Sequence, residues 1–407
     1  MVKFTTIILG AILATNINAD LISGLASGTV KAVDGTVQAV LTPTTACAPT
    51  PTPTVPSPGP APNPTTVSPP PSPPPSPPQP TPSPVTNNNI IYGANNSLVG
   101  NLNSLIGSQN TVQGYSNKIV GNANINLGSY SNIVGSNNLL KGNYNNLQGN
   151  LNSVLGSVNT LVGSGNGVVG NYNGINGNLN NLIGSGNLIG GSANTVSGDL
   201  NTIANGNLNT ISGAQNVINN GNLNGITGSA NYVQGSVNLV KGDTNTLVGN
   251  YNTVGGSNNT IAGSSNGISG SSNNVVGNLN GVIGSNNSLN GNSNQLNGNQ
   301  NSLQGSSNVL NGNLNTVLGN TNNILGNSNT AIGSTNSIYG DLNSILGNLN
   351  TAVGTSNTII GNSNLAAGIG NSQVGSQNIA VGNANSQFGN GNTAIGCANT
   401  AIGNNNT

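Results

Sequence analysis

The sequence predicts an all-β fold, a two-faced parallel β-solenoid with about 14 residues in each coil. The prediction rests on a seven-residue frame that repeats without a break from Gly93 to Ile402. The frame is Gly, then Asn or Ser, any residue, Asn, any residue, an aliphatic residue and any residue. It occurs 44 times, and 43 copies have Asn at the fourth position. Repeats this short and strict are typical of stacked arrays.

The residue types of the frame favour strands and turns over a helix. Gly reaches positive φ at little cost, and Asn or Ser beside it suits a tight corner, so the first three positions predict a turn. The fourth to seventh positions are left for a strand. A helix is disfavoured because each Gly would cost it about 1 kcal/mol relative to Ala. Two frames make one coil, so 44 frames give 22 coils and a rod on the order of 100 Å long.

Alternation along the strand decides which positions face inward. The fourth and sixth positions lie on one side and the fifth and seventh on the other. Because the sixth is aliphatic in 41 frames, as at Leu105 and Val112, we expect it inside together with the fourth-position Asn. A buried Asn needs partners for its amide. Stacking in register would let it bond the turn backbone and the same Asn one coil away.

Two departures from the frame carry expectations of their own. The frames at 198–205 and 213–220 each hold one extra residue, and a local bulge on the same side of adjacent coils would keep the register. From Ala331 onward the sixth position is often small or polar and the seventh apolar, as in Ala352 and Val353. We expect the inward side to switch there. The alternative is that the C-terminal coils expose an apolar face.

The residues before the array predict export and a spacer. Residues 1–19 resemble a secretion signal, with Lys3 before an apolar run and the small Ala19 at the cleavage point. The run is too short to span a bilayer, and no later segment reaches about 18 apolar residues, so no membrane span is expected. A retained anchor is the alternative. We expect a secreted protein, extracellular or associated with the cell surface or wall.

Two further segments precede the array at 87–407. Residues 20–42 have apolar side chains at spacings of three to five, which allow a short helix, although the segment also matches two loose heptads. Residues 43–86 are rich in Pro, Ser and Thr and cannot bury a core. They predict a disordered, extended linker in the polyproline II conformation.

The composition excludes most chemistry. The chain has no His, Trp, Arg or Glu, and its five Lys and five Asp give a net charge of zero. Nucleic-acid binding needs cationic side chains that release counterions, so that class is excluded. General acid–base and metal chemistry need clustered His, carboxylates or thiolates, and the many hydroxyl groups have no base to activate them. We expect no enzyme activity, no cofactor and no metal.

From Thr246 to Thr400 the outward fifth positions of alternate frames form a run of small hydroxyl side chains, interrupted only by Asn274. These residues are Thr246, Thr260, Ser288, Ser302, Thr316, Thr330, Ser344, Thr358, Ser372, Ser386 and Thr400. The matching positions of the other frames are mixed. A flat ladder of hydroxyl groups without charges can order water in a lattice-like pattern, as binding to ice requires. The alternative is that Ser and Thr are simply good exposed strand residues.

Two families resemble the array. Asn110-Thr111-Val112-Gln113-Gly114 and Asn194-Thr195-Val196-Ser197-Gly198 resemble the Asn-x-Val-x-Gly repeats of grass ice-recrystallisation-inhibition proteins. That resemblance implies a left-handed β-roll of about 14 residues per coil. C-terminal units such as Asn399-Thr400-Ala401-Ile402-Gly403 resemble the heads of trimeric autotransporter adhesins. On the candidate face the chain departs from the grass pattern by carrying Gly174, Leu188, Val217 and Tyr232.

These observations lead to one main functional hypothesis and two others. The main hypothesis is a secreted ice-binding protein that adsorbs to ice through the Ser/Thr ladder. The alternative is an extracellular structural or adhesive repeat protein of the cell surface, the wall or a filament, in which the array self-associates. Binding of a neutral polysaccharide is a third option, disfavoured because the chain has only eight Tyr and two Phe to stack on sugar rings.

Overall fold

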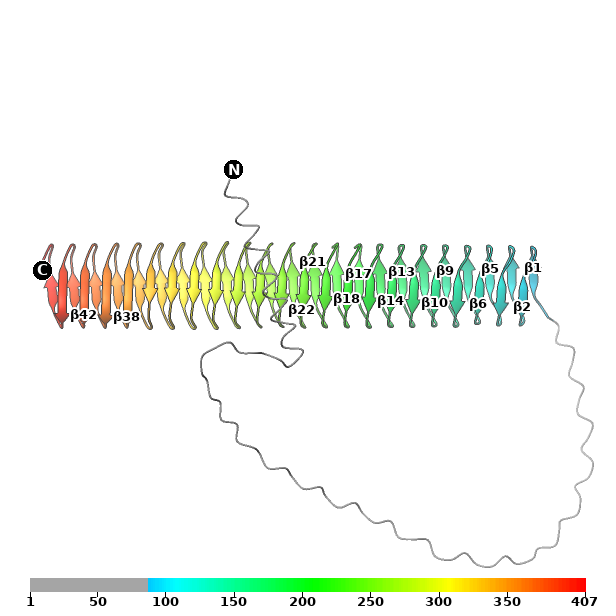
Figure 1. Ribbon diagram of the computed structural model, residues 1–407, viewed down its shortest axis with the longest axis horizontal. Coiled ribbons are helices and arrows are strands. Elements are labelled where there is room, and N and C mark those ends of the chain that lie inside the picture. The colour runs from blue at the N-terminus through cyan, green and yellow to red at the C-terminus, as the bar shows by residue number, and fades with distance from the viewer. Residues whose placement is uncertain (1–86) are drawn as a thin grey trace, which may run out of the picture. The chain divides into compact units, whose positions relative to one another are not determined.

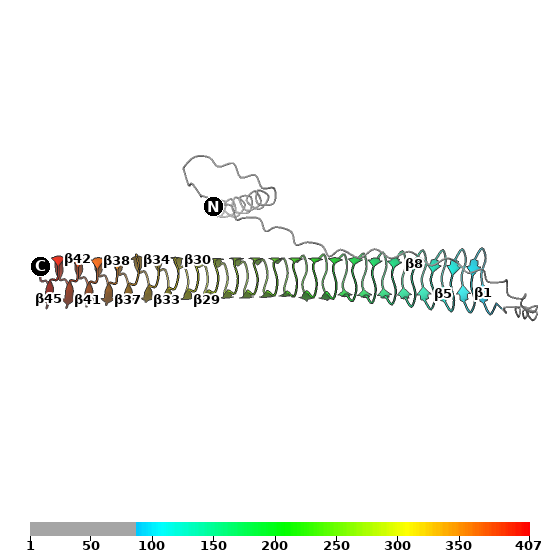
Figure 2. The ribbon, with the colours of Figure 1, turned by 90° about the horizontal axis from the view of Figure 1, so that it is seen from below.

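A computed structural model describes residues 87–407, which form one continuous array of 45 short strands. The coils stack along a single axis (Figure 1), and a view turned by 90° shows the strands on two opposite sides of the array (Figure 2). The predicted two-faced parallel β-solenoid is therefore confirmed. The predicted signal at 1–19, the segment at 20–42 and the linker at 43–86 lie outside the described residues.

The strands divide into two sheets by parity. The odd-numbered strands form sheet A, which consists of β1 (Ile90–Tyr92), β3 (Ser104–Ile106), β5 (Lys118–Val120), β7 (Asn132–Val134), β9 (Asn146–Gln148), β11 (Thr160–Val162), β13 (Gly174–Asn176), β15 (Leu188–Gly190), β17 (Thr202–Ala204), β19 (Val217–Asn219), β21 (Tyr232–Gln234), β23 (Thr246–Val248), β25 (Thr260–Ala262), β27 (Asn274–Val276), β29 (Ser288–Asn290), β31 (Ser302–Gln304), β33 (Thr316–Leu318), β35 (Thr330–Ile332), β37 (Ser344–Leu346), β39 (Thr358–Ile360), β41 (Ser372–Val374), β43 (Ser386–Phe388) and β45 (Thr400–Ile402).

The even-numbered strands form sheet B. They are β2 (Ser97–Val99), β4 (Thr111–Gln113), β6 (Ile125–Leu127), β8 (Leu139–Lys141), β10 (Ser153–Leu155), β12 (Gly167–Val169), β14 (Asn181–Ile183), β16 (Thr195–Ser197), β18 (Thr210–Ser212), β20 (Gly225–Thr227), β22 (Leu239–Lys241), β24 (Thr253–Gly255), β26 (Gly267–Ser269), β28 (Gly281–Ile283), β30 (Gln295–Asn297), β32 (Val309–Asn311), β34 (Asn323–Leu325), β36 (Ser337–Tyr339), β38 (Thr351–Thr355), β40 (Leu365–Ile369), β42 (Ile379–Asn383) and β44 (Thr393–Cys397).

Each strand pairs in parallel with the strand one coil before it and the strand one coil after it. The register is uniform, so Thr316 on β33 pairs with Ser302 on β31 and with Thr330 on β35. The two longer frames leave this register intact. Thr195 pairs with Thr210, and the extra residues Asn205 and Asn220 follow β17 and β19 on the same side of adjacent coils, with φ of 53° and 51°. The predicted bulges are confirmed.

The turns contain two positions with positive φ, of which one was predicted. Gly312 has a φ of 143°, and a Cβ atom there would overlap the carbonyl oxygen of Gly326 in the next coil. The third position of the frame is left-handed as well, as at Leu314 with a φ of 60°. Its amide donates to the carbonyl of Asn299 in the preceding coil at 3.0 Å. Stacking of the turns therefore holds non-glycine residues in a conformation they seldom adopt.

The interior consists of an aliphatic column and an Asn column, as predicted. Val317 and its equivalents are buried, and so are the fourth-position Asn side chains. The backbone amide of Asn315 donates to Oδ1 of Asn301 at 2.9 Å, and its Nδ2 donates to the same oxygen at 3.1 Å and to the carbonyl of Gly326 at 2.8 Å. Each Asn thus ties three successive levels of the array together, which satisfies its buried amide.

The predicted switch of the inward side after Ala331 is wrong. Ala331, Ala352 and Ala366 remain fully buried, and the seventh-position Val353 and Phe388 are exposed. The reason is the Asn column, which continues through the region and must face inward to keep its hydrogen bonds. Because the sixth residue shares a side with the fourth, it must face inward even when it is small. The alternative, an apolar outer face on the C-terminal coils, is what the structure has.

Candidate functional site

The predicted Ser/Thr ladder lies on sheet A in one continuous column. Every member occupies the first residue of an odd-numbered strand between β23 and β45, and each is the direct register partner of the next except across one gap. Asn274 on β27 occupies the one gap, between Thr260 and Ser288. All eleven hydroxyl side chains point outward; Thr330 and Ser372 are half-buried and the other nine are exposed.

Each ladder residue is held by buried neighbours on both sides. Thr316 lies between the buried Asn315 and the buried Val317, and its backbone amide donates to the carbonyl of Asn329 at 2.8 Å. The same arrangement recurs one coil later, where Thr330 donates to the carbonyl of Asn343 at 2.8 Å. The backbone under the hydroxyl groups is therefore rigid, and adjacent hydroxyls are about 4.8 Å apart along the axis.

A second outward column runs beside the hydroxyl ladder on sheet A. It consists of the seventh-position residues, about 6.6 Å further along each strand. From β33 onward all its members are apolar: Leu318, Ile332, Leu346, Ile360, Val374, Phe388 and Ile402. Val374 is half-buried and the others are exposed. The C-terminal part of sheet A is therefore a plane of two parallel columns, one of hydroxyl groups and one of apolar side chains.

The face of sheet A carries almost no charge. Lys118 on β5 is the only charged residue in its strands, so β7 through β45 are neutral. The acidic side chains of the array, Asp199, Asp243 and Asp341, lie in turns, where each accepts a hydrogen bond from a backbone amide at 2.7 Å. Ordered water over β7 through β45 of this face would therefore meet neutral groups alone.

The N-terminal half of the same column does not continue the ladder. Gly174, Leu188, Val217 and Tyr232 occupy the fifth positions of β13, β15, β19 and β21. These residues differ in size and lack a repeated hydroxyl group. The candidate surface is therefore confined to the coils from β23 to β45.

A smaller hydroxyl surface on sheet B escaped the sequence analysis. Thr195 and Ser197 on β16 pair with Thr210 and Ser212 on β18, so two hydroxyl columns lie side by side and are exposed. Thr227 on β20 extends one column by a further coil. The signal was present in the repeated Thr-x-Ser-Gly unit, but the extra residue at 205 places the two copies 15 residues apart instead of 14.

The described part of the chain lacks a cluster of metal ligands and a membrane-spanning helix. Residues 87–407 contain no group of three or more His, Cys, Asp or Glu side chains close enough to hold a metal ion. No helix in that range is long and apolar enough to cross a membrane. The surface chemistry available there is mainly that of hydroxyl, amide and apolar groups, with three Lys and three Asp side chains.

Part of the repeat array is similar to a known protein family. Residues 182–277 match the family model of the grass antifreeze beta roll. A search of curated proteins finds no matching sequence. The beta-roll match runs from β14 to β27, so it includes the whole sheet B patch together with Thr246 and Thr260 of the ladder.

The beta-roll match confirms the resemblance to the grass repeats, which was based partly on Asn194-Thr195-Val196-Ser197-Gly198 inside the matched range. Most of the Ser/Thr ladder, from Ser288 to Thr400, lies beyond the match but continues the same coils in the same register. The resemblance of the last units to adhesin heads stays a prediction.

Proposed function

We propose that this protein is secreted and adsorbs to ice through the Ser/Thr ladder of sheet A. The observation that carries the proposal is the ladder itself, eleven hydroxyl side chains in one register column on the part of sheet A whose strands carry no charge. The match of residues 182–277 to the grass antifreeze beta roll supports an ice-binding role. The match also supports a role without enzyme activity, since the family is one of binding domains.

The mechanism we propose is surface recognition of ordered water. Hydroxyl groups hold water molecules in fixed positions. The apolar column from Leu318 to Ile402 forms no hydrogen bonds with the neighbouring water, so these molecules bond to one another in cages that can join an ice crystal. Each contact contributes little. Binding therefore requires a surface that is already ordered, so that no conformational entropy is lost on contact. The stacked Asn column and paired backbone meet that requirement.

Adsorption of this kind is tested on the purified full-length protein. We expect micromolar protein to inhibit recrystallisation of ice, to shape ice crystals, and to become enriched in a slowly growing ice hemisphere relative to an inert protein of similar mass. Absence of all three effects at micromolar concentration would overturn the proposal.

The sheet B patch is a second candidate ice-binding surface. It lies wholly within the beta-roll match, whereas only two ladder residues do. It is short, with Thr195, Thr210 and their partners covering three coils, so we expect it to contribute less than the eleven-residue ladder. Replacing Thr195 and Thr210 together with Tyr measures its share. We expect most of the activity to remain in that variant.

Assembly is a second candidate function, favoured by the apolar columns on both faces of the C-terminal coils. Sheet B carries Leu325, Tyr339 and Val353 exposed opposite the apolar column of sheet A. Contiguous exposed apolar surface marks association sites in many proteins. Sedimentation velocity separates the two functions, because persistent oligomers that lack ice activity would favour a structural or adhesive protein.

A further inference from the structure

The N-terminal coils carry a cluster of aromatic side chains on one edge of the array. Tyr115, Tyr130, Tyr144 and Tyr172 all lie in turns that lead from sheet B to sheet A, within five successive coils. They are 54–70% exposed and include half of the eight Tyr of the chain. The rings of Tyr130 and Tyr144 are stacked, with centroids 4.8 Å apart and planes 4° from parallel. We call these four residues the Tyr ridge.

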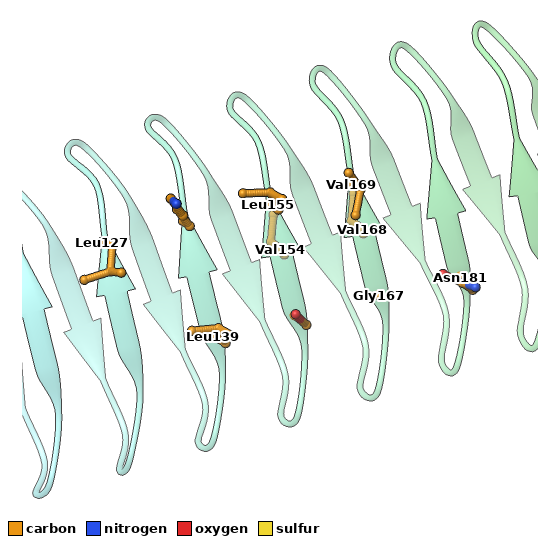
Figure 3. A pocket seen from close by; sticks show the side chains of 10 residues that line it. Leu127, Leu139, Val154, Leu155, Gly167, Val168, Val169 and Asn181 are labelled. Carbon is orange, nitrogen blue, oxygen red and sulfur yellow. The ribbon is translucent and has the colours of Figure 1, made fainter.

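A shallow depression of about 400 Å³ lies on sheet B in the same coils (Figure 3). It exists because Gly167 on β12 has no side chain where neighbouring strands carry larger residues. Leu139, Leu155 and Val169 form its apolar walls. Lys141 is the one charged residue among the lining residues, and Ser153 and Asn181 supply neutral polar groups.

The depression and the Tyr ridge are neighbours by chain connectivity. Lys141 is the last residue of β8, and the turn that follows it carries Tyr144. Val169 ends β12 in the same way, just before the turn that carries Tyr172. The two features therefore lie in the same coils, the depression on sheet B and the Tyr ridge in the turns that leave its strands.

Charge is segregated along the array, and this surface lies at the positive end. Residues 87–198 contain Lys118 and Lys141 and no acidic residue, whereas residues 199–407 contain three Asp and a single Lys. That Lys is Lys241, and Asp243 follows it two residues later in the sequence. A ligand bound near Lys141 therefore meets a positive potential without a neighbouring carboxylate.

We propose that the Tyr ridge and the depression bind an anionic polysaccharide, a chain of sugars with carboxylate or sulfate groups. Sugar rings have apolar C–H faces that pack on aromatic rings, and the ridge offers such rings over several coils. The ammonium group of Lys141 pairs with the anionic group, and Ser153 and Asn181 bond sugar hydroxyls. This site is separate from the ice-binding ladder, which begins at Thr246, and does not depend on it.

The first measurement is calorimetric titration of the full-length protein at low salt with three polymers: polygalacturonate, dextran sulfate and neutral dextran. We expect binding to one or both anionic polymers and none to dextran. Binding should weaken about tenfold between 20 and 200 mM salt, because exposed ion pairs are screened over that range. Equal binding to neutral dextran, or no binding to either anionic polymer, would overturn the proposal.

Three variants with matched controls locate the site. Gly167→Leu fills the depression, and Gly281→Leu adds the same side chain at the equivalent position of β28, where nothing lies within 4 Å of the new Cβ. Lys141→Gln removes the charge, and Lys241→Gln removes a charge from the same position of β22. We expect Gly167→Leu and Lys141→Gln each to weaken binding of the anionic polymer about tenfold, and Gly281→Leu and Lys241→Gln to leave it unchanged.

The third pair tests the Tyr ridge. Tyr144→Ala together with Tyr172→Ala should weaken binding at least about fivefold, whereas Tyr251→Ala, an exposed Tyr on the opposite edge, should not. Equal losses in variants and controls would contradict the assignment. Inhibition of ice recrystallisation is measured on the same samples. Loss of polymer binding with unchanged ice activity, or the reverse, then shows which of the two proposals fails.

Discussion

The Nε2 atom of Gln373 donates a hydrogen bond to Oε1 of Gln387, 2.8 Å away, inside the C-terminal coils. Both side chains occupy the sixth position, where other coils place an aliphatic residue. Their Nε2 atoms also donate to the carbonyls of Leu365 and Ile379 on the opposite sheet, each at 2.8 Å. The polar pair thus joins the two sheets across the interior, while the next residues along the chain, Val374 and Phe388, point outward.

This pair predicts strongly non-additive stability. Gln373→Leu alone removes the donor to Gln387 Oε1 and leaves that buried oxygen without its partner, so we expect a loss of about 1–3 kcal/mol. Changing both residues to Leu removes both polar groups, and also Oε1 of Gln373, which has no hydrogen-bond partner. The double variant should be at least as stable as the wild type. Denaturant unfolding of the wild type, Gln373→Leu, Gln387→Leu and the double variant measures the coupling; additive effects would contradict it.

A second prediction concerns a polar defect in the core near β6. Asn126 is fully buried at a sixth position, and its Oδ1 has no hydrogen-bond partner. Asn126→Val should stabilise the protein by about 1–3 kcal/mol, because it removes an unsatisfied polar atom from an aliphatic column. Asn124→Val, two residues earlier, is the matched control.

That control should have the opposite sign. Asn124 belongs to the Asn column, donating from Nδ2 to the carbonyl of Gly135 at 2.8 Å and accepting from the backbone amide of Asn138 at 3.1 Å. Its replacement breaks these bonds. Thermal melts followed by circular dichroism measure both changes, and a lower melting temperature for Asn126→Val would show that the defect is satisfied in solution.

A third prediction separates two kinds of Gly in the array. Gly312→Ala should destabilise the protein by at least about 2 kcal/mol, since the residue has positive φ and its Cβ would meet the next coil. Gly267→Ala should be neutral or slightly stabilising, because it lies in a strand with no atom within 4 Å of the new Cβ. Equal effects at the two positions, measured by denaturant unfolding, would contradict the stacked-turn geometry.

Most of the fold could be predicted from the sequence because each frame position has one physical role. Gly312 and Asn315 stand for two such roles, the stacked turn and the inner hydrogen-bond column, and the structure places both as expected. The prediction of the inward side after Ala331 was wrong because it rested on the small size of the sixth-position residue. The hydrogen bonds of the fourth-position Asn decide which side of the strand faces inward. The left-handed conformation of Leu314 leaves no trace in composition, since that position accepts almost any residue.

The candidate ladder could be predicted because a 14-residue period fixes which residues are neighbours. Thr316 and Thr330 are register partners for that reason alone. The sheet B patch was missed where an extra residue breaks the period. The depression beside the Tyr ridge was not predicted. The period places Lys141 and Gly167 two coils apart, but whether they line one depression depends on the sizes and conformations of the side chains around them.

The account depends above all on the ladder as the surface that contacts ice. Replacing Thr316, Thr330 and Thr358 together with Tyr places three bulky side chains on consecutive and nearby strands of sheet A. The matched control replaces Asn323, Ser337 and Thr351 with Tyr at the same positions of β34, β36 and β38 on sheet B. Both triple variants should keep the β-sheet circular dichroism of the wild type, because all six positions point outward from the strands.

The measurement is thermal hysteresis, together with recrystallisation inhibition, on these two variants and the wild type at equal micromolar concentration. We predict that the sheet A variant loses both activities and that the sheet B control retains both. A folded sheet A variant with the activity of the wild type would contradict the account.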